Sequence, residues 1–172
     1  NTRITNAGLA RVPLLRELDL GEPDDLDSPI TDAGLAHVPL LEELNVNCNM
    51  HVSDAGLVHV PRLLLLNMGI ALPATRFSDA GLARVPRLTT LILTDSPHLT
   101  DAGLARVPLL TQLYMRDAPH ITGAALRHVP LLRYLNDEEG HPMTDADLCH
   151  VPRLEELILA RESTVTDAGL AR

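Results

Sequence analysis

The sequence repeats one ten-residue motif, almost unchanged, about every 22 residues. Residues 30–39 read ITDAGLAHVP, and residues 99–108 read LTDAGLARVP. Copies of the motif begin at Ile4, Ile30, Val52, Phe77, Leu99, Ile121, Met143 and Val165. A fixed period in this range predicts a solenoid, in which one small supersecondary unit is stacked many times. We therefore expect a single domain over residues 1–172, of about seven repeats, that is a segment of a longer chain.

A second pattern in each repeat predicts a strand. After the Pro of the motif, residues 88–93 read LTTLIL and residues 110–115 read LTQLYM. The last two apolar residues alternate with outward-pointing ones, as a short β-strand requires. A polar turn follows, then a Thr or Ser that suits a helix N-cap, and then a short helix that Pro ends. We expect parallel strands in one sheet near 18–20, 44–46, 66–68, 91–93, 113–115, 135–137 and 157–159.

Together, the L-x-x-L-x-L pattern and the I/L-T-D-A-G-L motif resemble the leucine-rich repeat, most closely its T-D-x-G-L type in F-box-associated and bacterial repeat arrays. The resemblance covers essentially the whole chain. It implies an α/β solenoid with parallel strands on the concave face and short helices or 3-10 turns on the convex face, and it implies a binding scaffold. The polar residue usual in the family just after the strand is mostly absent, so we expect no Asn or Cys ladder between the turns.

Two columns of polar residues repeat with the motif. His or Arg precedes Val-Pro, and Asp follows the Thr or Ser in most copies. An active site needs one special constellation, whereas these residues are interchangeable copies, so we expect the Asp residues to cap the helices that follow them. No catalytic motif or metal-ligand spacing stands out. We therefore expect a protein that is not an enzyme, with no catalytic residue, no cofactor and no metal.

The residues that change from repeat to repeat are the candidates for recognition. They lie between the leucines of the strands, where side chains point to the concave face. The candidate partner-binding residues are Leu65, Ile92, Tyr114, Arg116 and Tyr134 in the middle strands, and Glu17, Asp19 and Glu43 in the first two. Insertions at 23–29 and 70–76, which we expect at one edge of the sheet, support a working face there. The alternative, that strand positions merely tolerate change, stays open.

Charge is unevenly distributed along the chain. Residues 1–60 carry 3 Arg and 10 acidic residues, residues 61–136 carry 8 and 4, and residues 137–172 carry 3 and 9. From this we expect a concave face that is acidic at both ends and neutral to basic in the middle, and a protein or peptide partner with basic flanks. The alternative is that the acidic ends only keep the chain soluble. The net charge of −9 disfavours nucleic acid, and the absence of a long apolar run predicts no membrane span.

The resulting hypothesis is a protein- or peptide-binding scaffold. The alternative is a substrate-receptor or sensor arm of a larger protein, such as a ubiquitin-ligase-like adaptor or a bacterial defence sensor. Cys48 and Cys149 lie far apart in a stacked solenoid, which predicts two free thiols in a reducing, cytoplasmic compartment. All 14 cationic residues are Arg, which we interpret as the coding bias of a GC-rich bacterial genome.

Two positions conflict with the simple repeat. Asp137 occupies a strand position that is apolar in the other repeats, so we expect it to be exposed by a bend or hydrogen-bonded in the turn. At the ends, neither terminal repeat carries a polar cap, and we expect Leu9 and Leu170 to be exposed there. This predicts a chain that continues beyond both ends or associates end to end.

Overall fold

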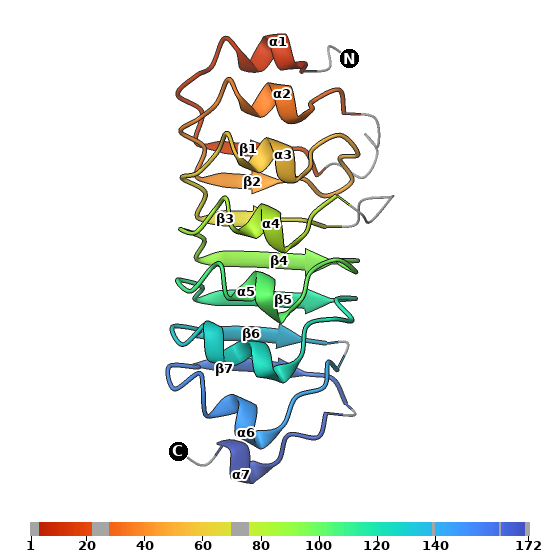
Figure 1. Ribbon diagram of the computed structural model, residues 1–172, viewed down its shortest axis with the longest axis vertical. Helices are drawn as coiled ribbons and strands as arrows, with labels where there is room; N and C mark the ends of the chain where they lie inside the picture. Colours follow the sequence, from red (N-terminus) through yellow and green to blue (C-terminus); the bar gives the residue numbers. More distant parts are fainter. Residues whose placement is uncertain (1–3, 22–27, 70–75, 139, 162, 171–172) are drawn as a thin grey trace.

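A computed structural model describes residues 4–21, 28–69, 76–138, 140–161 and 163–170. They form one sheet of seven parallel strands, hydrogen-bonded in chain order (Figure 1). This confirms the predicted sheet, and every strand begins one residue before its predicted start. The strands are β1 (Glu17–Asp19), β2 (Glu43–Asn45), β3 (Leu65–Asn67), β4 (Thr90–Thr94), β5 (Gln112–Arg116), β6 (Tyr134–Asp137) and β7 (Glu156–Leu159).

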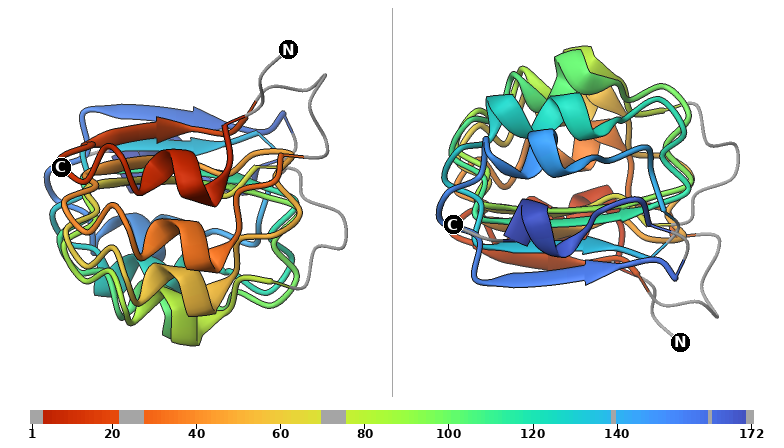
Figure 2. Two further views of the ribbon diagram at one scale, coloured as in Figure 1. Left: turned by 90° about the horizontal axis from the view of Figure 1, so that it is seen from above. Right: turned by 90° about the horizontal axis from the view of Figure 1, so that it is seen from below.

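The helices form a second layer along one face of the sheet (Figure 1). Each α-helix is four residues long, which confirms the predicted shortening. They are α1 (Asn6–Leu9), α2 (Asp32–Leu35), α3 (Asp54–Leu57), α4 (Asp79–Leu82), α5 (Asp101–Leu104), α6 (Asp145–Leu148) and α7 (Asp167–Leu170), and the sixth repeat has the 3-10 helix η1 (Gly123–His128). Seen along the stack, the end repeats are displaced toward the open side of the sheet, so the sheet face is concave (Figure 2).

Leucine and valine columns fill the space between the layers. Leu66, Leu91 and Leu113 of successive strands are fully buried. Leu9 is also buried, at 2 % exposed, so the prediction that it is exposed was wrong. It lies against the next helix at Gly34, which covers it from the side of the second repeat. Leu170 is exposed, as expected.

The Asp column ties neighbouring repeats together, which corrects the expectation that each Asp caps its own helix. Each carboxylate accepts hydrogen bonds of 2.6–3.1 Å from both the backbone N–H and the hydroxyl of the Thr or Ser in the next repeat. The pairs are Asp32 with Ser53, Asp54 with Ser78, Asp79 with Thr100, Asp101 with Thr122, and Asp145 with Thr166. We call this column the Asp ladder.

The periodic glycines make room for the Asp ladder. A Cβ on Gly103 would lie 2.3 Å from the Oδ1 atom of Asp79, which is closer than non-bonded atoms approach. The periodic glycines are therefore packing positions. The sixth repeat has Ala125 at this position, beside Asp101, and it is the repeat with a 3-10 helix in place of an α-helical turn. We attribute the changed winding to this extra methyl group.

The ladder is interrupted once, by an exchange of residue types. Gly123 stands where the other repeats have Asp or Asn, and Asp147 stands in the following repeat where most have Gly. The Oδ2 atom of Asp147 accepts hydrogen bonds from the N–H and the hydroxyl of Thr144, at 2.8 and 2.7 Å. A Cβ on Gly123 would lie 2.5 Å from that oxygen. Thr144 is therefore still hydrogen-bonded to a carboxylate, but this carboxylate belongs to its own repeat.

In β1 to β5, strand length follows from the residue on the open face just after the central leucine. In β1, β2 and β3 this residue is Asp19, Asn45 or Asn67, and its side-chain oxygen accepts a hydrogen bond from the N–H two residues later, at 2.7–3.0 Å. Such a local turn competes with the sheet and ends these strands after three residues. Ile92 and Tyr114 offer no such acceptor, and β4 and β5 run for five residues.

Asp137 is buried, at 1 % exposed, and is hydrogen-bonded within the turn. It accepts from the backbone N–H of His141, at 3.1 Å, and its Oδ1 atom lies 2.5 Å from the His141 Nδ1 atom. The imidazole is itself only 6 % exposed. The expectation of a hydrogen-bonded turn is confirmed, and that of an exposed Asp137 is wrong. A buried carboxylate is tolerated because polar partners surround it.

Candidate functional site

The open face of the sheet consists of the strand side chains that alternate with the buried leucines. In each strand the residues on either side of the central leucine are partly or fully exposed. The parallel register aligns them in rows across the sheet, so that Ile92 lies beside Tyr114, and Tyr114 beside Asn136. Tyr134 lies beside Gln112 on one side and Glu156 on the other.

A pair of tyrosines marks the middle of this face. The rings of Tyr114 and Tyr134 have centroids 4.7 Å apart and an angle of 34° between their planes. The pair is diagonal, because Tyr134 lies opposite the residue two before Tyr114. Partial burial raises the pKa of the Tyr114 hydroxyl, and the neighbouring Tyr134 and Glu156 raise it further. The two rings therefore form a pre-arranged apolar surface with neutral polar handles.

The structure brings together four of the eight predicted site residues. Ile92, Tyr114, Arg116 and Tyr134 lie on the three adjacent strands β4, β5 and β6, and we call this group the tyrosine patch. Leu65 lies in the same row as Tyr134, but Thr90 and Gln112 separate the two.

The three acidic candidates lie at the N-terminal end of the same face. Glu17 and Glu43 are neighbours in the register of β1 and β2, and both are exposed. Asp19 is exposed as well, but its Oδ1 atom holds the turn at Gly21. On the other side of the tyrosine patch, the exposed carboxylates are Glu138 and Glu156. Glu156 lies directly beside Tyr134 in the register of β6 and β7, and Glu138, in the turn after β6, accepts a hydrogen bond of 3.3 Å from the Asn136 side chain.

Most of the positive charge in the middle of the chain lies outside the sheet. Of the eight arginines in residues 61–136, Arg116 alone lies in a strand of the sheet. The middle of the concave face is therefore close to neutral, while Arg84, Arg106 and Arg127 lie on the convex side at or after the helices. Counting charge along the chain could not separate the two faces. The insertions around 23–29 and 70–76 fall largely outside the described residues.

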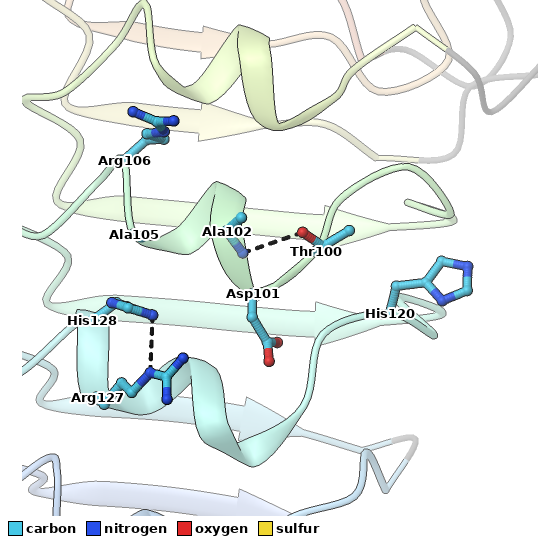
Figure 3. A pocket seen from close by; sticks show the side chains of 8 residues that line it. All are labelled: Thr100, Asp101, Ala102, Ala105, Arg106, His120, Arg127 and His128. Carbon is cyan, nitrogen blue, oxygen red and sulfur yellow. Dashed lines mark hydrogen bonds between the residues drawn. The ribbon is translucent and has the colours of Figure 1, made fainter.

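The convex side carries a cavity of about 540 Å³ between α5 and η1 (Figure 3). Arg106, Arg127 and His128 line it, together with Ala102 and Ala105. In the described part of the chain, no three His, Cys, Asp or Glu side chains lie close enough to hold a metal ion. Cys48 and Cys149 are free thiols. None of the described helices has the length and apolar character needed to cross a bilayer.

The fold resembles solved leucine-rich-repeat proteins. One is TLR13, from a structure of a TLR13–ssRNA13 complex, with a TM-score of 0.69 and 18% identity over 97% of this chain and 25% of that chain. Two others are internalins of Listeria monocytogenes. Internalin C2 has a TM-score of 0.61 and 18% identity over 96% of this chain and 78% of that chain. Internalin F has a TM-score of 0.59 and 18% identity over 96% of this chain and 60% of that chain.

This likeness shows an α/β leucine-rich-repeat solenoid, as the sequence resemblance implied. The chain spans a quarter of the TLR13 chain and more than half of each internalin chain. No protein-family model matches the sequence, and no curated protein sequence matches it.

Proposed function

We propose that this chain is a protein- or peptide-binding scaffold whose concave face recognises its partner, with Tyr114 at the centre of the site. The observation that carries the proposal is the tilted contact between the Tyr114 and Tyr134 rings on the open sheet. Tyrosine buries a large area and keeps a polar handle, which is why it is enriched among interface anchors. A repeat array that differs mainly at these positions supports the same conclusion.

The acidic side chains on both sides of the tyrosine patch define the chemistry of the partner. Glu17 and Glu43 lie on one side, and Glu138 and Glu156 on the other. A partner with an apolar or mixed centre and basic flanks complements this arrangement, and its association is expected to weaken as salt increases. We favour a protein over a nucleic acid because Arg116 is the only Arg in the described strands and the net charge is −9.

The repeat subtype supports the same class of function. We assign the repeats to the T-D-x-G-L type because the Thr, Asp and Gly of this motif are the three groups that form the Asp ladder. The solved neighbours are compatible with a binding scaffold. TLR13 was solved in complex with an RNA, so the fold alone does not determine the class of partner, and the side chains of the site do. The alternative, a receptor or sensor arm of a larger protein, uses the same face and adds an effector domain.

The experiment is a selection followed by a measured affinity. A peptide display library is selected on the wild-type chain and counter-selected on an unrelated protein, so that the selection itself does not favour peptides that need the Tyr114 ring. We expect a consensus with an apolar centre and flanking Lys or Arg. By calorimetry, Tyr114→Ala should weaken binding of the selected peptide by about 2 kcal/mol, which is about thirtyfold.

The matched control is Arg106→Ala, on the convex face, which should change the affinity of that peptide by less than about 0.5 kcal/mol. If the Arg106 variant loses binding and the Tyr114 variant retains it, the proposed concave site is wrong. An acidic consensus would contradict the proposed partner chemistry.

A further inference from the structure

The convex face has a groove across three consecutive repeats. The cavity between α5 and η1 shares Ala102 and Arg106 with a second cavity, of about 410 Å³, between α4 and α5. Ala83 and Ala105 complete the floor of the two cavities. We call this continuous surface the convex groove.

Three arginines and a histidine line one side of the groove. Arg84, Arg106 and His128 occupy the same position in successive repeats, just before Val-Pro. Arg127 is specific to the sixth repeat, because the corresponding residues are Ala10, Ala36, Val58, Ala83, Ala105, Cys149 and Ala171. The repeat that departs most from the others in helix type therefore also adds a cation to the groove.

Arg127 and His128 lie side by side at one end of the groove, and Arg106 projects from the preceding repeat (Figure 3). The Nε–H of Arg127 donates a hydrogen bond to the Nε2 atom of His128, at 3.1 Å. This contact orients the guanidinium, whose other N–H groups remain to bind a ligand. Within the described residues, Arg84, Arg106 and Arg127 form no ion pair with an acidic side chain.

Two carboxylates lie at the other side of the groove, and both are already engaged. Asp79 accepts two hydrogen bonds from Thr100, and Asp101 accepts two from Thr122. Figure 3 shows the Asp101 side chain directed from the start of α5 toward η1. An anionic ligand is therefore drawn to the Arg side of the groove, and its uncharged part faces the alanine floor.

We propose that the convex groove binds an acidic peptide segment of a partner protein, with ligand carboxylates paired to Arg84, Arg106 and Arg127. The planar guanidinium matches a carboxylate in a two-pronged hydrogen-bonded pair, and alanines leave room for the aliphatic part of Glu or Asp. This surface is separate from the concave site and selects the opposite charge. The proposal therefore goes beyond the proposed function and does not depend on it.

A single-stranded nucleic acid would use the same arginines but also needs stacking surfaces for its bases. The chain has three aromatic residues in all. Phe77 is buried in the core, and Tyr114 and Tyr134 lie on the opposite face. The net charge of −9 also opposes a polyanion at long range, whereas a short acidic segment interacts mainly within the screening length. The observations favour a peptide.

The test measures fluorescence anisotropy with a short fluorescein-labelled peptide that alternates Glu and Ala. The uncharged control replaces each Glu with Gln, and an oligouridylate of equal charge tests nucleic acid. The variants are Arg106→Gln and Arg127→Ala, the second of which introduces the residue that five other repeats have at this position. The matched charge control is Arg62→Gln, an exposed position outside the groove.

We expect the wild-type chain to bind the Glu peptide more tightly than the Gln peptide or the oligouridylate. Each groove variant should weaken binding at least about threefold, and the double variant about tenfold. Arg62→Gln and Tyr114→Ala should stay within about twofold of wild type. Equal affinity for the Glu and Gln peptides would overturn the proposal. So would a loss in Arg62→Gln as large as in the groove variants, or tighter binding of the oligouridylate.

Discussion

Gly123 and Asp147 carry the most specific information at the scale of single residues. In the other described repeat pairs, an Asp or Asn reaches forward to the next Thr or Ser, and this pair instead takes the carboxylate from the second repeat. Either substitution alone would be unfavourable. A Gly at the Asp position leaves the Thr without an acceptor, and an Asp at the Gly position lies too close to the Asp of the preceding repeat. The two changes are tolerated because they occur together.

The same exchange should therefore be transferable to the fourth and fifth repeats. Asp79→Gly removes both hydrogen bonds to Thr100, and Gly103→Asp places a second carboxylate beside Asp79. We expect each single variant to lose about 1–3 kcal/mol of unfolding free energy and the double variant to recover at least half of the summed loss. Urea denaturation of the four proteins measures this. A double variant that is less stable than either single one would contradict the assigned contact.

At the scale of elements, the turns that follow the strands explain which residue types occur at one position of the repeat. Cys48, Asp95 and Asp117 occupy the same position of their repeats, and their φ angles of 60°, 49° and 50° lie in the left-handed region. Asp tolerates this conformation better than most residues, and β-branched side chains tolerate it poorly. The turn therefore restricts the residue type through its backbone conformation.

This restriction predicts how substitutions at Asp117 behave. Asp117→Gly should leave the unfolding free energy within about 0.5 kcal/mol of wild type, because Gly adopts positive φ without strain. Asp117→Val should lower it by about 1–2 kcal/mol. Thermal and urea unfolding of the two variants give the comparison. Equal stability of the Gly and Val variants would show that the turn does not impose the left-handed conformation.

How much of the structure the sequence predicts also depends on scale. The strands and their parallel order follow from the L-x-x-L-x-L pattern, because alternation within one repeat determines which side chains are buried. The Asp ladder was missed because its partners belong to different repeats, and a pattern read within one repeat favours a local cap. The joint exchange at Gly123 and Asp147 was the available signal. The Tyr114–Tyr134 contact could be recognised only from the register of the strands. The charge of each face could be recognised only once the residues of the sheet and those of the helix layer were told apart.

At the scale of the whole molecule, the two faces of the solenoid differ in chemistry. The concave face presents the tyrosine patch, with one Arg, between acidic strands, and the convex face presents arginines beside exposed alanines. The concave surface arises from residues that vary between repeats, whereas the convex one arises from a repeated column of Arg or His to which the sixth repeat adds Arg127. We thus propose one scaffold with two recognition surfaces of opposite preference, of which the concave surface is the principal site.

The most direct test of that claim uses the tyrosines themselves. The chain has no Trp and two Tyr, so its intrinsic emission comes from the tyrosine patch. With a selected partner peptide that contains neither Tyr nor Trp, acrylamide quenching of this emission reports whether the patch is covered. We predict that saturating peptide lowers the quenching constant at least about twofold, since buried rings are shielded from the quencher. Saturation shown by calorimetry with quenching unchanged would place the bound peptide elsewhere and contradict the account.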